Sequence, residues 1–138
     1  MARKAKALVM DTWAIIAYLE DEPSAQQIAD LIASAHEEEI PVYMTVVNVG
    51  EVWYNIAREI SEDDANNSVK ELRDLRIQFV DADWELTQEA ARFKSQHKMS
   101  YADCFAVALA KQRKAEVVTG DRDFRQVQGE VKILWLKK

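Results

Sequence analysis

The sequence has 138 residues, of which 49% are hydrophobic and 30% are charged, and its net charge is −6 at pH 7. This length fits one domain, 1–138. The chain has a single cysteine, Cys104, and shows no secretion signal, which indicates a cytoplasmic protein. No run approaches the roughly 18 apolar residues of a membrane span, so no membrane contact is expected. The acidic balance excludes a uniformly basic nucleic-acid-binding surface, so a nucleic acid would need a local basic rim or a bound cation.

Short apolar runs alternate with segments of helical periodicity along the chain. Strands are expected at 6–11, 41–45, 77–82, 116–120 and 131–136. Helices are expected at 12–20, from Ser24, at 46–60, from Ser61 to about Leu75, at 84–97 and at 101–114. Strands separated by helices predict an α/β fold, with a mostly parallel sheet of about five strands and helices on both of its faces.

Polar side chains at the predicted helix starts support these boundaries. Ser24 with Gln27, and Ser100 with Asp103, have the spacing of capping boxes, in which the two residues satisfy backbone N–H groups of the first turn. Further caps are expected at Thr45, Ser61 and Asp83.

Two aspartates stand directly after predicted strands. Asp11 follows the first strand, and Asp121 follows the fourth. Ligands of open α/β sheets bind outside the carboxyl ends of the strands, so neighbouring first and fourth strands would bring both carboxylates to one crevice. Taken singly, each aspartate also has a structural explanation, because Asp11 could cap the following helix and Asp121 could stabilise a turn.

Two further acids lie on predicted helices. Asp103 suits a capping box and the helix dipole, yet its helix is apolar almost all round, which holds this acid near the sheet. Glu51 shares a helical stripe with Asn48 and Asn55, and periodicity alone favours a solvated face for that stripe.

Carboxylates crowded together raise one another's pKa values and resist joint ionisation unless a cation neutralises them. His36 and His97 do not form a metal-binding pair, and Cys104 has no thiol partner, which excludes a typical zinc site. Oxygen ligands favour Mg²⁺ or Mn²⁺. Such an ion can polarise a phosphodiester and lower the pKa of an attacking water.

The ordered set of motifs VMDTWAIIAYLEDEP, MTVVNVGEVWYNIA, SYADCFAVALA and VVTGDRDF covers nearly the whole chain and resembles PIN-domain proteins, more narrowly the VapC-type ribonuclease toxins of toxin–antitoxin pairs. The resemblance implies a PIN-like three-layer fold and an Mg²⁺- or Mn²⁺-dependent endoribonuclease that leaves a 5′-phosphate and a 3′-hydroxyl. By this resemblance Asp11, Asp103 and Asp121 are the nearer metal ligands. Glu51 acts through water and Asp123 is an auxiliary acid.

The resemblance also implies supporting residues and partners. Thr12 and Thr119 match site-flanking hydroxyls that bond carboxylates or water. The expected partners are an RNA substrate, a cognate antitoxin and a second copy of the chain. Arg122 and Arg125 flank the site and could attract the RNA backbone, or serve solubility alone. Trp13 departs from the small polar residue common among relatives, and it either packs its helix or shapes the substrate entrance.

Two other functions stay open from the sequence. A receiver-type signalling domain is also a five-stranded α/β fold, and Asp81 would be its phosphoacceptor, although receivers carry paired acids where Thr12 here follows Asp11. A catalytically silent binding module could keep the PIN fold. The sequence does not select among transfer, ribosomal and messenger RNA.

Overall fold

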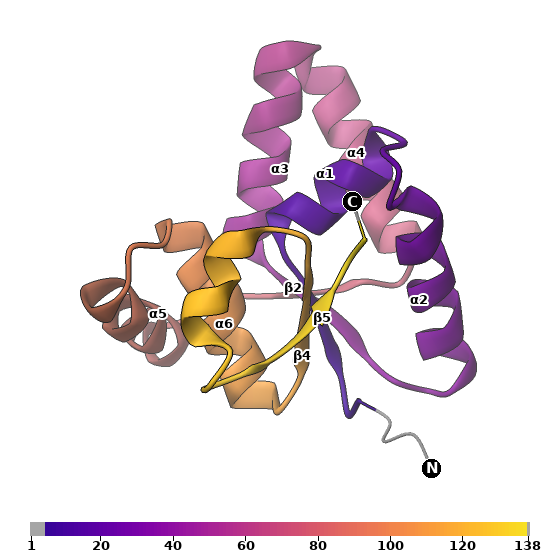
Figure 1. Ribbon diagram of the computed structural model, residues 1–138. Helices are drawn as coiled ribbons and strands as arrows, with labels where there is room; N and C mark the ends of the chain where they lie inside the picture. Colours follow the sequence, from indigo (N-terminus) through magenta and orange to yellow (C-terminus); the bar gives the residue numbers. More distant parts are fainter. Residues whose placement is uncertain (1–4, 138) are drawn as a thin grey trace.

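Figure 1 shows a computed structural model that describes residues 5–137, so the first residues of the basic N-terminal stretch and Lys138 lie outside the description. Its centre is a five-stranded sheet with the order β3-β2-β1-β4-β5, and every neighbouring pair is parallel. The strands are β1 (Leu8–Met10), β2 (Val42–Thr45), β3 (Gln78–Val80), β4 (Glu116–Thr119) and β5 (Lys132–Trp135). The predicted parallel α/β fold is confirmed, and β1 and β4 are neighbours as the crevice requires.

The helices fall close to the predicted ranges. They are α1 (Thr12–Leu19), α2 (Ala25–Glu37), α3 (Val46–Glu59), α4 (Glu62–Asp74), α5 (Trp84–Gln96) and α6 (Tyr101–Arg113). A short 3₁₀ helix, η1 (Arg122–Val127), was not predicted and follows β4. It occupies the stretch in which the sequence indicated only a turn.

Side chains alternate between the two faces of the sheet, as the period of two residues in a strand requires. Val9 and Val117 pack into a core with α5, α6 and η1. Leu8, Met10 and Val118 pack on the opposite face into a second core with the helices α1 to α4. The sheet is therefore the middle layer of three, as predicted, and Figure 1 shows α5 and α6 on one side of it and α2 on the other.

The predicted helix caps hold with one exception. The side chain accepts a hydrogen bond from the backbone N–H three residues on at Asp11, Thr45, Ser61, Asp83 and Ser100. The capping box predicted at Ser24 is wrong, because Ser24 has helical backbone angles (φ −84°, ψ −2°) and its side chain makes no capping bond. A capping side chain needs extended backbone angles at its own residue.

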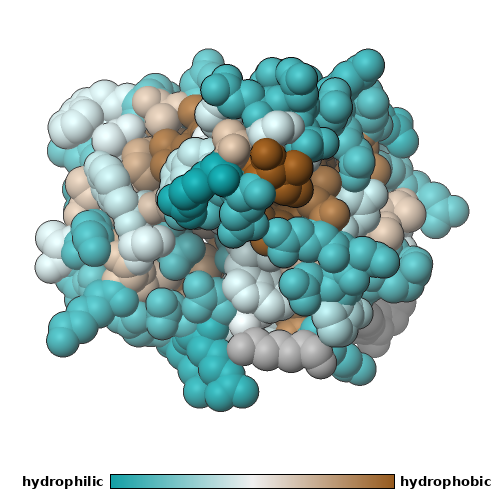
Figure 2. Space-filling view, turned by 90° about the horizontal axis from the view of Figure 1, so that it is seen from above, coloured by the Kyte–Doolittle hydropathy of each residue, from teal (hydrophilic) through white to brown (hydrophobic). Residues whose placement is uncertain are grey.

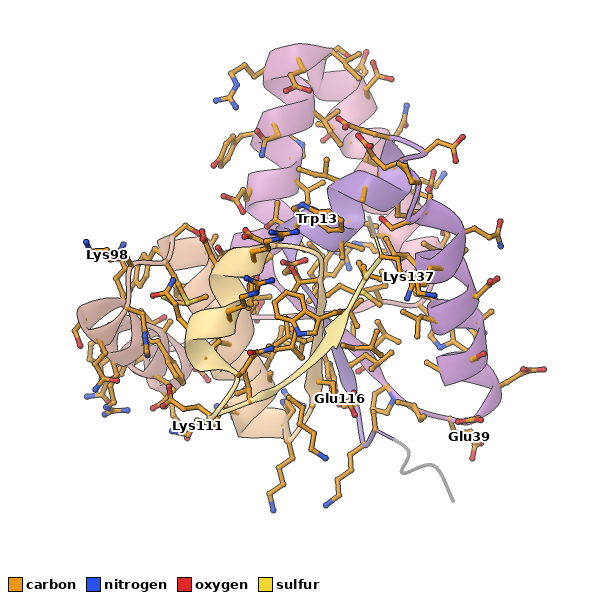
Figure 3. All side chains as sticks on the ribbon, viewed as in Figure 1. Trp13, Glu39, Lys98, Lys111, Glu116 and Lys137 are labelled. Carbon is orange, nitrogen blue, oxygen red and sulfur yellow. The ribbon has the colours of Figure 1, made fainter. Side chains whose placement is uncertain are left out.

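The carboxyl ends of β1 and β4 point upward in Figure 1 and lie near its middle, below α3 and α4 and beside the starts of α1 and η1. Figure 2 looks onto this edge and shows mostly hydrophilic side chains with an apolar patch among them. Figure 3 places Trp13 at this end and both Lys111 and Glu116 at the opposite end. Within residues 5–137, no helix combines the length and apolar character that crossing a membrane requires.

Candidate functional site

Asp11 lies at the junction of β1 and β4 and is completely buried. Its Oδ1 accepts a hydrogen bond from the backbone N–H of Ala14 at 2.8 Å, which caps α1. Its Oδ2 accepts one from Thr119 Oγ1 at 2.5 Å. Asp11 is therefore both a helix cap, as its structural explanation required, and part of a buried contact between the two strand ends.

Thr119 connects this buried carboxylate to Asp121. While its hydroxyl donates to Asp11, its Oγ1 accepts a hydrogen bond from the backbone N–H of Asp121 at 3.0 Å. Asp121 Oδ1 in turn accepts from the backbone N–H of Asp123 at 2.9 Å and caps η1. The expected carboxylate contact of the Thr119 hydroxyl is thus present, and Asp121 also stabilises the turn.

Three carboxylates converge at this edge. Oxygen atoms of Asp103, Asp121 and Asp123 lie within 4.8 Å of one another. Asp103 is buried, Asp121 is half-buried and Asp123 is exposed. Asp103 reaches the group from the first turn of α6, where its backbone N–H donates to Ser100 Oγ at 3.1 Å. The trio therefore joins the start of α6 to the start of η1.

The electrostatics couple Asp11 to this trio. Burial raises the pKa of Asp11 from 3.8 to about 8, and the charges of Asp103 and Asp121 add to the rise. Burial likewise raises the pKa of Asp103 from 3.8 to about 7, with further upward contributions from Asp121, Glu51 and Asp123. All five predicted acids thus belong to one electrostatic cluster, although only three have oxygens within 4.8 Å of one another.

Glu51 comes from the second turn of α3 and is half-buried. Its charge helps to raise the pKa of Asp103, which places it on the site side of α3. Its Oε2 accepts a hydrogen bond from Tyr54 Oη at 3.3 Å. Glu51 lies outside the group formed by Asp103, Asp121 and Asp123.

Asn48 is a positioning residue that the sequence did not single out. The stripe it shares with Glu51 predicted a solvated face, but Asn48 is completely buried. Its Nδ2 donates to Thr12 Oγ1 and to the carbonyl oxygen of Ala102, both at 3.1 Å, and its Oδ1 accepts from Thr45 Oγ1 at 2.6 Å. Asn48 therefore joins the starts of three helices, next to Asp11 and Asp103.

Thr12 contacts Asn48. Its hydroxyl was expected to bond a carboxylate or water, and within the described residues its Oγ1 donates to the carbonyl oxygen of Asn48 at 3.5 Å and accepts from Asn48 Nδ2. Thr12 follows Asp11 on α1, which points its side chain toward α3 rather than toward the acids. It supports the site through Asn48.

Trp13 packs against Gly120, between Thr119 and Asp121. A Cβ atom added at Gly120 would come within 3.0 Å of three ring carbons of Trp13. Trp13 is half-buried and packs against the core that contains Ile15 and Val118. The packing role weighed for Trp13 is therefore present, and glycine is the residue that lets the indole lie over this backbone.

Gly120→Ala is expected to lower the free energy of unfolding by about 1–3 kcal/mol, because a methyl group forced into packed space displaces its neighbours. Urea unfolding measures the change. The matched control is Gly50→Ala within α3, where an added Cβ meets nothing within 4 Å. That variant should gain roughly 0.5–1 kcal/mol, since alanine favours a helix interior over glycine. Equal gains in both variants would contradict the tight contact with Trp13.

The cluster has the chemistry of a divalent-cation site. Its ligands are all carboxylate oxygens, which suit Mg²⁺ or Mn²⁺. Across residues 5–137, no Lys or Arg side chain forms an ion pair with any of the five acids. Each carboxylate has about four acceptor sites, so the hydrogen bonds to Asp11 and Asp121 leave oxygen lone pairs free. A cation would relieve the mutual repulsion of these acids, and the residues fit one.

Comparison with known protein families identifies the family of this chain. The profile of the PIN domain matches residues 8–130, and this chain belongs to the PIN-domain family. A comparison with curated protein sequences finds no match.

Solved structures of VapC20, VapBC2 and FitAcB share the fold. VapC20 from Mycobacterium tuberculosis, described as a toxin that cleaves the sarcin–ricin loop, has a TM-score of 0.70 and 16% identity over 88% of this chain and 95% of its own. VapBC2 from Rickettsia felis, bound to promoter DNA, has a TM-score of 0.74 and 12% identity over 95% and 99%. FitAcB from Neisseria gonorrhoeae has a TM-score of 0.67 and 21% identity over 92% and 96%.

The receiver-type alternative does not fit the sheet. Asp81 follows β3, which is an edge strand, and β2 separates β3 from β1. Asp81 therefore does not share the crevice between β1 and β4 where the acid cluster lies. The family match excludes a receiver domain as well.

Proposed function

We propose that this protein is an Mg²⁺- or Mn²⁺-dependent endoribonuclease and the toxin of a toxin–antitoxin pair. The observation that carries the proposal is the cluster of carboxylates at the carboxyl edge of a parallel sheet, in which Asp11 and Asp103 have raised pKa values and no acid has a basic ion-pair partner within residues 5–137. Membership of the PIN family and the similarity to VapC toxins support it.

The proposed roles of the acids follow from their positions. Asp11, Asp103 and Asp121 would hold the ion, Asp123 would assist at the exposed side, and Glu51 would act through water. A bound ion would polarise the phosphodiester and lower the pKa of the attacking water. Attack of this water at phosphorus with cleavage of the bond to the 3′ oxygen would leave a 5′-phosphate and a 3′-hydroxyl.

The chain's own residues keep these oxygens in place. The Thr119 hydroxyl donates a hydrogen bond to Asp11 and accepts one from the backbone N–H of Asp121, so this one hydroxyl positions two of the acids. Asn48 fixes the starts of α1 and α6 from the buried side. Ligands held by packed secondary structure are positioned in advance of the substrate, which removes reorganisation from the reaction step.

The partners are proposed on the same basis. Two of the similar solved structures are toxin–antitoxin assemblies, VapBC2 and a complex from Klebsiella pneumoniae, which supports a small protein antitoxin for this chain. We also propose a homodimer that works in the cytoplasm.

The test is cleavage of RNA by the purified protein, freed of any antitoxin, in Mg²⁺ or Mn²⁺. Cleavage should stop when EDTA removes the cation and return when the cation is restored. Total RNA is the first substrate, with sequencing of the new 5′ ends to map the sites, and ribosomal RNA is included because the similar VapC20 acts on the sarcin–ricin loop. A protein that binds RNA but leaves it intact under all these conditions would instead be a silent binding module.

A further inference from the structure

The 3₁₀ helix η1 sorts its side chains onto three faces. In a 3₁₀ helix there are three residues per turn, so side chains at i and i+3 lie above one another. Phe124 and Val127 are both completely buried in the core. Asp123 belongs to the carboxylate trio. The remaining face carries Arg122 and Arg125, and both line one pocket, as the period of three requires.

This pocket is lined by residues next in sequence to Asp121 and Asp123. It has a volume of about 430 Å³. Its lining residues are Gly120, Arg122, Arg125, Gln128, Trp135 and Leu136. The backbone N–H of Leu136 donates to the carbonyl oxygen of Thr119 at 2.8 Å, so the pocket sits at the carboxyl ends of β4 and β5. Gly120 forms part of its wall and is the residue before Asp121.

The two arginines have no partner for their charge within the described part of the chain. Neither guanidinium group takes part in a hydrogen bond, an ion pair or a ring contact there. By contrast, Arg58, Arg73, Arg92 and Arg113 each contact an amide, a carboxylate or an aromatic ring. In a protein with a net charge of −6, two unpaired guanidinium groups on one pocket wall are a local basic site that suits an anion.

We propose that this pocket binds the nucleotide next to the cleaved phosphodiester of a single-stranded RNA. The inference rests on the proposed nuclease function. It adds a positively charged contact for the substrate, which a cluster of carboxylates does not provide. Arg122 and Arg125 bind the phosphate through charge-assisted hydrogen bonds, and Trp135 supplies an apolar wall for the base or sugar. The volume falls within the range of roughly 300–1,000 Å³ typical of small-ligand sites.

The arrangement resolves an electrostatic difficulty of the proposed enzyme. Four or more carboxylates at the crevice repel a polyanion, and the net charge of the chain does so as well. One divalent cation carries two positive charges and cannot neutralise all five carboxylates of the crevice. The arginine pocket attracts the strand at the neighbouring position and fixes its direction across η1. A phosphate contact of this kind positions the strand without reading its sequence.

RNA binding by paired double variants tests the proposal. All proteins carry Asp103→Asn to prevent cleavage, and the probe is a fluorescently labelled single-stranded RNA of mixed sequence, titrated by anisotropy in Mg²⁺ at several salt concentrations. Arg122→Gln with Arg125→Gln should weaken binding about tenfold or more at low salt. It should also reduce the slope of log K against log[salt] by about 0.7, since the two arginines together neutralise one phosphate of a single strand.

The control is Arg76→Gln with Arg92→Gln, which also removes two positive charges, one from the turn after α4 and one from α5. Its salt slope should match the parent. Equal salt slopes in the two double variants would overturn the proposed RNA contact of the pocket. The proposal would also be overturned if the arginine variant bound RNA as the parent does but lost binding to an acidic peptide, a result that would assign the arginines to a protein partner.

Cleavage assays in the unmodified background separate this inference from the proposed function. There the arginine variant should raise KM with little change in kcat, the result of losing binding that substrate and transition state share. If the parent cleaves no RNA while its RNA binding still depends on Arg122 and Arg125, the enzyme function is overturned and the pocket is supported. If the parent cleaves RNA and the arginine variant matches the control in KM, the pocket is overturned and the enzyme function stands.

Discussion

Asp103→Asn is expected to reduce the rate of RNA cleavage by more than about 100-fold, since changes to groups that merely support a metal ligand already cost 10–100-fold. Asparagine keeps the size of the side chain and one acceptor oxygen, but it loses the charge that would hold the cation. Asp103 has oxygen neighbours in both Asp121 and Asp123, so its loss removes the member of the trio that α6 supplies. Initial rates on a mapped RNA site, at saturating Mg²⁺, measure the effect.

The chain contains a closely matched control for this substitution. Asp64 occupies the same place in α4 that Asp103 occupies in α6: its backbone N–H donates to Ser61 Oγ at 3.0 Å, as that of Asp103 donates to Ser100 Oγ at 3.1 Å. Asp64→Asn therefore removes a capping-box acid without touching the cluster. It should leave the cleavage rate unchanged and cost a few tenths of a kcal/mol of stability. If both variants cleave RNA at the parental rate, Asp103 serves only as a helix residue.

The sequence predicted the site through one rule about parallel sheets. Asp11 and Asp121 are 110 residues apart in the printed numbering, and neither is distinctive by itself. Placing each at the carboxyl end of a strand brought them to one edge, and the pairing of Met10 with Val118 shows that the two strands are neighbours. Helical periodicity added Asp103, because an apolar helix must lie on the sheet and carries its first-turn acid with it.

The parts that could not be predicted depend on tertiary contacts. Periodicity assigned Asn48 to a solvated face, yet the starts of α1 and α6 cover it and provide partners for its amide. The capping signal at Ser24 failed because the backbone there is already helical. The helix η1 was missed because two aspartates after Gly120 are typical of a turn, although the spacing of Phe124 and Val127 fits a repeat of three residues.

Without a divalent cation, the protein is expected to lose stability as the pH rises from about 5 to about 8. The pKa of Asp11 is about 8 and that of Asp103 about 7 in the folded protein, against 3.8 for an unperturbed aspartate. Between these values the folded chain binds protons that the unfolded chain has released, so the free energy of unfolding falls with rising pH. One pKa unit corresponds to about 1.4 kcal/mol, so the three units between pH 5 and the folded pKa of Asp11 should cost about 4 kcal/mol, and Asp103 adds to this loss. Urea midpoints in EDTA measure the decline.

Asp11→Asn separates this effect from the general repulsion of an acidic protein. Asparagine does not titrate, and its Oδ1 can still accept from the backbone of Ala14 and cap α1. The variant should therefore have a flatter pH profile and exceed the parent in stability at pH 8 without metal, although it should not cleave RNA. Mg²⁺ should raise the parental midpoint at pH 8, because a ligand that binds only the folded state stabilises it by mass action, and it should raise that of the variant less. A parental stability that stays level or increases from pH 5 to pH 8 would show that folding does not raise the pKa values of these two aspartates. Burial, with the charges of the neighbouring acids added to it, makes their ionisation unfavourable in the folded protein, and a cation bound at the crevice would offset that same cost.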